Sequence, residues 1–227
     1  MTQKENGNVI KLIIGLGTLL LFLYIINPPF REASGIYLIM LGLTWLIYSS
    51  KVYQDELIGI NKRNLGKSFF WAFLIGVGFY VLSSLVPGLS LGLPTLPGAV
   101  SDGLKFFTVV FVASIAEELF FRGGLLGYIK KFSPSKRQIW LAIIIQAVAF
   151  SLFHLGAYIS GLYAYPDFAT ALTAINANIS SFIVAFIFGI LSGYIVSRDG
   201  IRNLVFSIIL HIIFNFIIYT KLVVLIS

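Results

Sequence analysis

The sequence VASIAEELFFRGG, from Val112 to Gly124, places three ionisable side chains inside a long apolar run. Glu118 precedes Arg122 by four residues, so in a helix the two side chains share a face and can form an ion pair. Glu117 points about 100° away from Glu118 on the same helix, so the two carboxylates need not do the same work. Charged groups in apolar surroundings are costly, and this stretch therefore calls for a functional explanation.

The composition around this stretch indicates a membrane protein. Of the 227 residues, 58% are hydrophobic and only 11% are charged, and the mean hydropathy is +0.95. A soluble domain of this length cannot hide so much apolar surface. We therefore predict an all-α, polytopic membrane protein that forms a single membrane domain over residues 1–227. The chain has no cysteine, which excludes disulfides, thiolate metal sites and a cysteine nucleophile.

Seven segments are candidates for membrane-spanning helices, because a span needs about 20 mainly apolar residues. They cover residues 9–27, 35–52, 68–88, 104–128, 138–159, 178–197 and 203–226. An eighth membrane-embedded segment within 89–103 or 160–177 is the alternative. The N-terminal run resembles a signal peptide but has no small-residue cleavage site, so we interpret it as a retained first helix.

The basic residues between these segments predict the orientation. With seven spans, twelve Lys and Arg residues fall on one side and only Arg31, Lys105 and Lys221 fall on the other. The positive-inside rule then places the N-terminus in the cytoplasm and the C-terminus outside. The net charge of +7 reflects this topology rather than nucleic-acid binding, because the basic residues form short clusters without a stripe or interleaved aromatic residues.

Two further predicted spans carry polar residues at helical spacing. FSLFH ends in His154 and has Phe150 one turn earlier, and HIIFN begins with His211 and ends with Asn215. These are the only two histidines of the chain, and both lie in predicted spans. Together with Glu117 they are compatible with one polar cavity near the middle of the bilayer, at a cost of about 2.5–3.5 kcal/mol for each charged group on insertion scales.

A carboxylate, two imidazoles and a carboxamide suit hydrolysis by activated water. Glu117 would act as general base, and His154 would hold the water and pass the proton to the leaving amine. His211 and Asn215 would donate hydrogen bonds to the oxyanion. Other hydrolytic mechanisms lack their residues, since the chain has no HExxH or GxSxG motif and none of its four aspartates lies in a predicted span.

Each feature also has a purely structural interpretation. Glu118 and Arg122 can be a buried ion pair that locks helices together. A single histidine or asparagine in a span is often an interhelical hydrogen-bond partner. Phe150 is a packing residue under either interpretation. The combination on three helices is more specific than its parts.

The chain resembles the CPBP family of intramembrane proteases, which includes the type II CAAX prenyl proteases and the bacterial Abi proteins linked to bacteriocin processing and self-immunity. The family pattern is EExxxR, then FxxxH, then HxxxN or HxxxD, on three membrane helices. This chain has EELFFR, FSLFH and HIIFN in that order within 117–215. We place the motif-bearing core at about 104–226.

The resemblance implies a water-activating carboxylate with a histidine partner, an oxyanion-stabilising pair and a supporting ion pair. In that order, these are Glu117 with His154, His211 with Asn215, and Glu118 with Arg122. It also implies a membrane peptide or a lipid-modified protein tail as the substrate, the lipid bilayer as surroundings, and a bacterial plasma membrane as the location. The first three helices carry no family motif and are expected to frame the cavity.

The metal requirement is open at this stage. Members of the family are labelled metalloproteases, although a metal-independent, glutamate-dependent mechanism is also associated with them. Glu117, His154 and His211 could supply a His₂Glu zinc set. Glu118 would then have to leave Arg122 to act as the base, so we prefer the mechanism without a metal cofactor.

Two other functions compete with proteolysis. A non-enzymatic bacteriocin-immunity or signalling protein of the same family would use the polar cluster only to hold helices together. A proton-coupled transporter would use buried Glu and His as a proton relay. Against the transporter, the sequence shows no inverted repeat and no pair of broken helices.

Overall fold

The part of the chain that the structure describes is built from seven helices and contains no β-strand. The structure is a computed structural model, and it describes residues 3–26, 31–49, 69–78, 106–131, 135–159, 173, 179–197 and 203–220. For these residues the all-α prediction is confirmed. The helices are α1 (Gln3–Ile26), α2 (Arg31–Ser49), a short helix over Phe69–Gly78, a composite helix over 106–131, α7 (Lys136–Ile159), α9 (Ile179–Ser197) and α10 (Leu204–Thr220).

Each described helix falls on one of the seven predicted spans, but the span count is not established. The stretch Lys136–His154 is long and apolar enough to cross a membrane, by length and composition alone. The other described apolar helices are 10–17 residues long by the same measure. Residues 79–88 and 221–226 of the predicted spans lie outside the described residues, as do 89–103 and, except for Thr173, 160–177.

The described residues have an apolar exterior and an apolar core in which charged and polar side chains are buried. Large apolar side chains are exposed on every long helix, among them Phe22, Trp45, Trp140, Leu152 and Phe216. Buried positions instead include charged and amide groups, among them Glu117, Glu118, Arg122, Gln146 and His211. This distribution is typical of a protein whose outer surface meets lipid and whose polar residues face the bundle interior.

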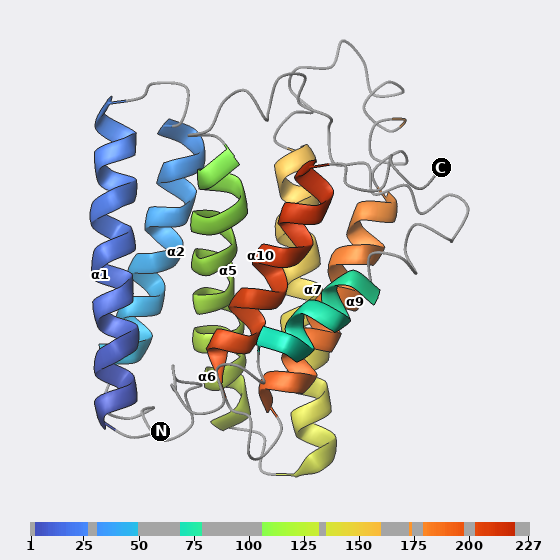
Figure 1. Ribbon diagram of the computed structural model, residues 1–227. Helices are drawn as coiled ribbons and strands as arrows, with labels where there is room; N and C mark the ends of the chain where they lie inside the picture. Colours follow the sequence, from blue (N-terminus) through green and yellow to red (C-terminus); the bar gives the residue numbers. More distant parts are fainter. Residues whose placement is uncertain are drawn as a thin grey trace.

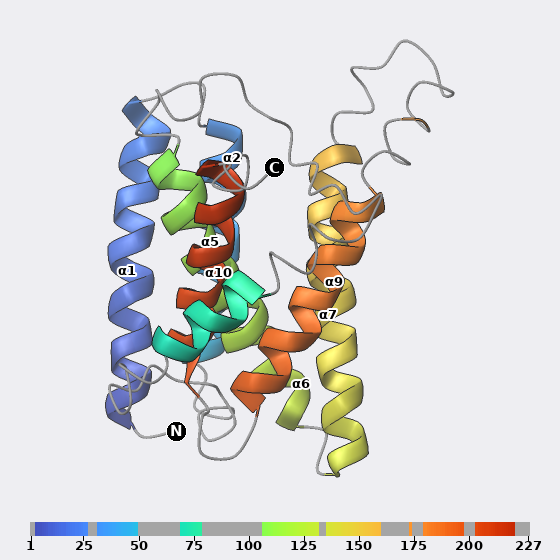
Figure 2. The same cartoon turned by 45° about the vertical axis from the view of Figure 1, so that its right-hand side comes forward.

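The helices form two groups around the composite helix 106–131 (Figure 1). α1 packs on α2, and α2 packs on the composite helix. On the other side α7 and α9 form a close pair, which Figure 2 shows apart from α1 and α2. α10 packs against the composite helix and α9, and the short helix over Phe69–Gly78 approaches it through Gly76 and Ile213. Residues far apart in sequence therefore meet where the composite helix, α7, α9 and α10 converge.

The pairing of α7 and α9 depends on a small residue. A Cβ added to Gly189 would lie 2.9 Å from the Cα of Ala147 and 3.0 Å from its Cβ. Small residues at such contacts let two helices approach closely and gain van der Waals contact. This approach brings Gly193 of α9 next to Gln146 of α7, and Phe188 of α9 next to Phe150 of α7.

Candidate active site

The two glutamates lie on a short α-helical segment of the composite helix. This segment, α5 (Ser114–Glu118), is flanked by two π-helical segments, η3 (Thr108–Ala113) and η4 (Leu119–Leu125), and the helix ends in α6 (Leu126–Lys131). π-Helical turns are rare and occur frequently at functional sites. Glu117 and Glu118 are both buried; both lie near His211, and their other partners differ.

Glu118 forms the predicted ion pair and has two further partners. Its Oε1 lies 2.8 Å from Nη1 of Arg122, and both side chains are fully buried. The same oxygen lies 2.9 Å from Nδ1 of His211. The hydroxyl of Ser207, on α10, donates to Oε2. A buried anion with these donors is well compensated, which explains how the interior accommodates it.

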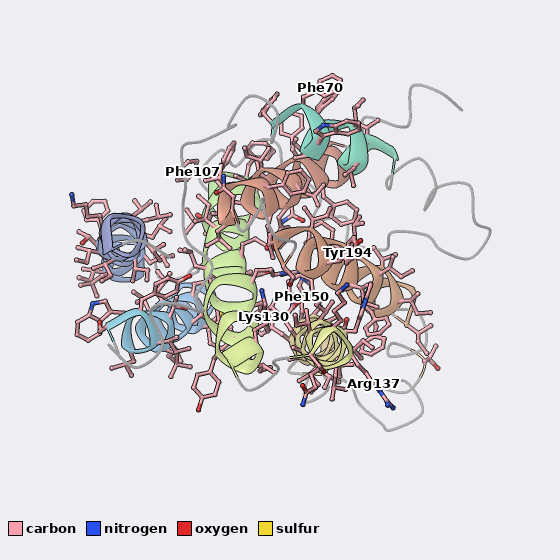
Figure 3. The ribbon with its side chains drawn as sticks, turned by 90° about the horizontal axis from the view of Figure 1, so that it is seen from below. Phe70, Phe107, Lys130, Arg137, Phe150 and Tyr194 are labelled. Atoms are coloured by element: carbon pink, nitrogen blue, oxygen red, sulfur yellow. The ribbon has the colours of Figure 1, made fainter. Side chains whose placement is uncertain are left out.

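Arg122 is held by two neighbouring helices as well as by Glu118. Its Nε donates to the hydroxyl of Ser192 on α9 at 2.9 Å. Its guanidinium carbon lies 4.0 Å from the ring centroid of Phe150 and 5.4 Å from that of Phe188. Such a cation–π arrangement is strongest away from water. Phe150 lies in the interior between α7, α9 and the composite helix (Figure 3).

Glu117 is the point where the two histidines meet. Its Oε2 lies 3.7 Å from Nε2 of His154 and 3.8 Å from Nε2 of His211. This oxygen is buried and has no hydrogen-bond partner among the described residues. Its other oxygen, Oε1, accepts a hydrogen bond of 3.2 Å from the hydroxyl of Tyr37 on α2.

The hydrogen bonds of the two imidazoles assign their protons. Nδ1 of His154 lies 2.9 Å from the carbonyl oxygen of Phe150, which can only accept, so this nitrogen donates. Nδ1 of His211 donates in the same way to the carboxylate of Glu118. In the neutral form, both rings therefore turn an Nε2 lone pair toward Glu117. The His154 side chain is 30% exposed, whereas those of Glu117 and His211 are 6% and 3% exposed.

Asn215 meets the composite helix one turn before Glu117. Its Nδ2 donates to the hydroxyl of Ser114 at 2.9 Å, and that hydroxyl donates to the carbonyl of Val110. A carboxamide nitrogen has two hydrogens, so one remains after this contact.

A comparison with known protein families matches the region of the chain that contains these polar residues. The family model of Type II CAAX prenyl endopeptidase Rce1-like proteins matches residues 99–217, more than half of the chain. The chain belongs to this family. The comparison with curated proteins returned no match, and neither did the comparison with solved structures.

The Rce1-like match confirms the resemblance found in the sequence. The matched residues include all three motifs, whereas α1, α2 and the short helix over Phe69–Gly78 precede the matched range. The family consists of membrane proteins with protease activity.

The polar residues of this Rce1-like chain do not fit a zinc site as they are placed. Within the described residues, no group of three or more His, Asp or Glu side chains is arranged to hold a metal ion. Ligands of tetrahedral zinc at about 2.0–2.1 Å lie about 3.3–3.4 Å from one another. The separations of 3.7 and 3.8 Å between Glu117 and the two histidines are wider.

Four polar contacts of the site were not anticipated from the sequence. They involve Tyr37 on α2, Ser114 on the composite helix, Ser192 on α9 and Ser207 on α10. A serine within an apolar helix carries no spacing signal of its own, because it contacts a residue that is distant in sequence. The GG pair, Gly123 and Gly124, was the one signal in the sequence that another helix packs closely against the composite helix at this point.

Proposed function

We propose that this chain is an intramembrane endopeptidase that hydrolyses a membrane-associated peptide or a lipid-modified protein tail with water activated by Glu117 and His154. The mechanism needs no metal cofactor. The observation that supports it best is Oε2 of Glu117, which has no hydrogen-bond partner among the described residues and faces an Nε2 atom of each histidine.

These three atoms are all acceptors when both imidazoles are neutral. Three acceptors that face one another without a donor repel, and a buried acceptor without a partner costs about 1–3 kcal/mol. A water molecule has two hydrogens and can donate one to Glu117 and one to His154. The 3.7 Å between Oε2 and Nε2 allows one water oxygen to lie within hydrogen-bond distance of both.

Peptide hydrolysis then follows from ordinary acid–base chemistry. The water oxygen attacks the scissile carbonyl carbon while its proton moves to Glu117. The tetrahedral intermediate collapses, the C–N bond breaks, and the proton passes to the leaving amine through His154. The carboxylate and the neutral imidazole are restored when the two products leave.

Two groups on α10 are suited to stabilise the oxyanion. Asn215 retains one N–H after its contact with Ser114. His211 can donate from Nε2 only when it is an imidazolium, because its Nδ1 proton already contacts Glu118.

The exposure of the site suggests how a substrate enters. The His154 side chain is more exposed than those of Glu117 and His211. A peptide that arrives from the bilayer would therefore reach the site past His154 on α7. In this proposal the chain has seven spans with the N-terminus in the cytoplasm, and the plasma membrane is bacterial.

Two quenched fluorescent probes test the proposal on the purified full-length protein. One is a peptide that ends in a farnesylated CAAX sequence, and the other is a peptide with an apolar segment of about 20 residues. We expect cleavage of at least one probe by the wild type and loss of at least 100-fold in kcat for Glu117→Gln, in line with the loss of a general base. Leu152→Ala, an exposed position on α7, is the matched control and is expected to retain activity.

The opposite results would overturn the proposal. Folded wild-type protein that cleaves neither probe, or folded Glu117→Gln protein with undiminished cleavage, contradicts a peptidase that uses this carboxylate. A Glu117→Gln protein that also keeps protecting cells from a bacteriocin would favour the non-enzymatic alternative.

A further inference from the structure

One contact to the candidate catalytic carboxylate comes from outside the family match. Tyr37, on α2, donates its hydroxyl to Oε1 of Glu117, which is 80 residues away in sequence, whereas the family model begins at residue 99. We propose that Tyr37 is a positioning residue of the active site, which orients Glu117 so that Oε2 faces His154 and His211. This inference rests on the proposed function.

The two oxygens of Glu117 have different surroundings. Oε1 has the Tyr37 hydroxyl at 3.2 Å, and Oε2 has no hydrogen-bond partner among the described residues. The terminal torsion of a glutamate is broad and close to two-fold, so an unrestrained carboxylate samples many orientations. A donor fixed on one oxygen restrains this rotation. The free oxygen then stays where the two histidines converge.

The position of Tyr37 is set by the packing of α2 on the composite helix. The Cγ2 atom of Thr44 lies 3.9 Å from a Cβ built on Gly124, which is also 80 residues later in sequence. Because both contacts join residues that are 80 apart in sequence, α2 and the composite helix run parallel and keep the same alignment over two turns. Tyr37 and Thr44 are seven residues apart and share a helix face.

The GG pair allows this packing. A Cβ added to Gly123 would lie 2.6 Å from the hydroxyl of Tyr48, and one added to Gly124 would lie 3.2 Å from Cδ1 of Ile47. Both are closer than ordinary side-chain contacts, so a larger residue here would have to displace the ends of the Tyr48 and Ile47 side chains. Gly123 and Gly124, which follow EELFFR in the sequence, thus let α2 approach the composite helix. Tyr37, which lies outside the motifs, can then contact Glu117 in the first motif.

The charged and titratable groups that face Glu117 are few, so the loss of one donor is measurable. They are Tyr37 from α2, His154 from α7 and His211 from α10, with Glu118 and Arg122 beyond His211. Of these, only Tyr37 contacts Oε1 among the described residues. Tyr37→Phe removes that hydroxyl and keeps the ring.

The first measurement compares Tyr37→Phe with Tyr48→Phe. Tyr48 is a buried tyrosine on the same helix face, and its hydroxyl lies beside Gly123, so its variant controls for the loss of a buried hydroxyl. On whichever probe the wild type cleaves, we expect kcat of Tyr37→Phe to fall by about 10- to 100-fold with KM within about twofold, because misplacement of a catalytic group slows the chemical step. The control is expected to keep its kcat.

The second measurement does not need a substrate. Dicyclohexylcarbodiimide adds across its N=C bond to a protonated carboxyl group in apolar surroundings and gives a stable acylurea. Tyr37→Phe removes the donor on Oε1 and leaves both oxygens of Glu117 without a hydrogen-bond partner among the described residues, so this carboxyl is freer to turn toward the reagent. We expect severalfold faster labelling of Glu117 in Tyr37→Phe than in the wild type and in Tyr48→Phe, measured by peptide mass spectrometry that resolves Glu117 from Glu118.

The results separate this inference from the proposed function. Wild-type kcat together with wild-type labelling in Tyr37→Phe would overturn the role of Tyr37 and leave the peptidase intact. Faster labelling in Tyr37→Phe, with no cleavage of either probe by the wild type, would support the contact and overturn the peptidase. A loss of kcat in both tyrosine variants alike would also count against a specific role for Tyr37.

Discussion

His211 is shared between the two adjacent glutamates. Its Nδ1 lies 2.9 Å from Oε1 of Glu118, while its Nε2 lies 3.8 Å from Oε2 of Glu117. Glu118 therefore does more than neutralise Arg122, because it also determines which nitrogen of the ring faces the candidate catalytic carboxylate. The orientation of a histidine by a carboxylate on its other nitrogen is a common way to select one tautomer.

Glu118→Gln is expected to lower both activity and stability. The change leaves the buried Arg122 without its anion, and loss of one partner of a buried ion pair costs about 3–5 kcal/mol. The free energy of unfolding, measured in detergent, should fall by about this amount, and kcat should fall in the fraction that remains folded. Ser207→Ala removes one donor to the same carboxylate and should cost less, about 1.5–3 kcal/mol. Equal stability of Glu118→Gln and wild type would show that the pair is not buried in the membrane-embedded protein.

Gln146→Leu is expected to be neutral or stabilising. The amide of Gln146 is fully buried, and neither its oxygen nor its nitrogen has a hydrogen-bond partner among the described residues. Replacement of an unpaired buried polar group by an apolar group of similar size removes a desolvation cost of about 1–3 kcal/mol. The thermal midpoint should stay level or rise. A clear fall in the midpoint would mean that the amide has a partner, such as a buried water.

Gly189→Ala is expected to destabilise the protein because it separates α7 from α9. The added methyl group would lie 2.9 Å from the Cα of Ala147, which belongs to the backbone and cannot rotate away. Overpacking of this kind costs about 1–3 kcal/mol. Gly42→Ala on α2 is the matched control, because an added Cβ there meets nothing within 4 Å and should gain up to about 1 kcal/mol from helix propensity. Similar unfolding curves for the two variants would contradict the close packing.

Treatment with a chelator is expected to leave peptidase activity unchanged. The proposed mechanism assigns the activation of water to protein groups, because the separations of 3.7 and 3.8 Å around Glu117 are wider than those between ligands of tetrahedral zinc. Cleavage of the probes should persist after dialysis against EDTA and 1,10-phenanthroline. Activity that disappears and returns with added zinc would establish a metal enzyme.

The sequence predicted which motif residues lie near one another better than it predicted the residues that contact them from other helices. Helical spacing was enough to pair Glu118 with Arg122, and an apolar background made the two histidines conspicuous. The structure brings both histidines to Glu117, although the catalytic roles of these residues stay predictions. Tyr37, Ser192 and Ser207 could not be found in this way, because their contacts depend on the packing of helices that are distant in the chain. The seven-span topology also stays a prediction, since within the described residues only Lys136–His154 meets the length and hydropathy required.

The π-helical segments of the composite helix affect how well it tolerates a change in the number of its residues. A π-helical turn holds more residues than an α-helical one, and η4 begins directly after Glu118. Because a π-helical turn holds extra residues, deletion of a single leucine or phenylalanine between Glu118 and Arg122 can be absorbed by a return of this stretch to α-helical pitch, which keeps the guanidinium near the anion. A deletion within the α-helical segment Ser114–Glu118 has no such extra residue to remove and would rotate the side chains on its two sides against each other by about 100°. The two halves of this helix therefore differ in how well they accept a shorter chain.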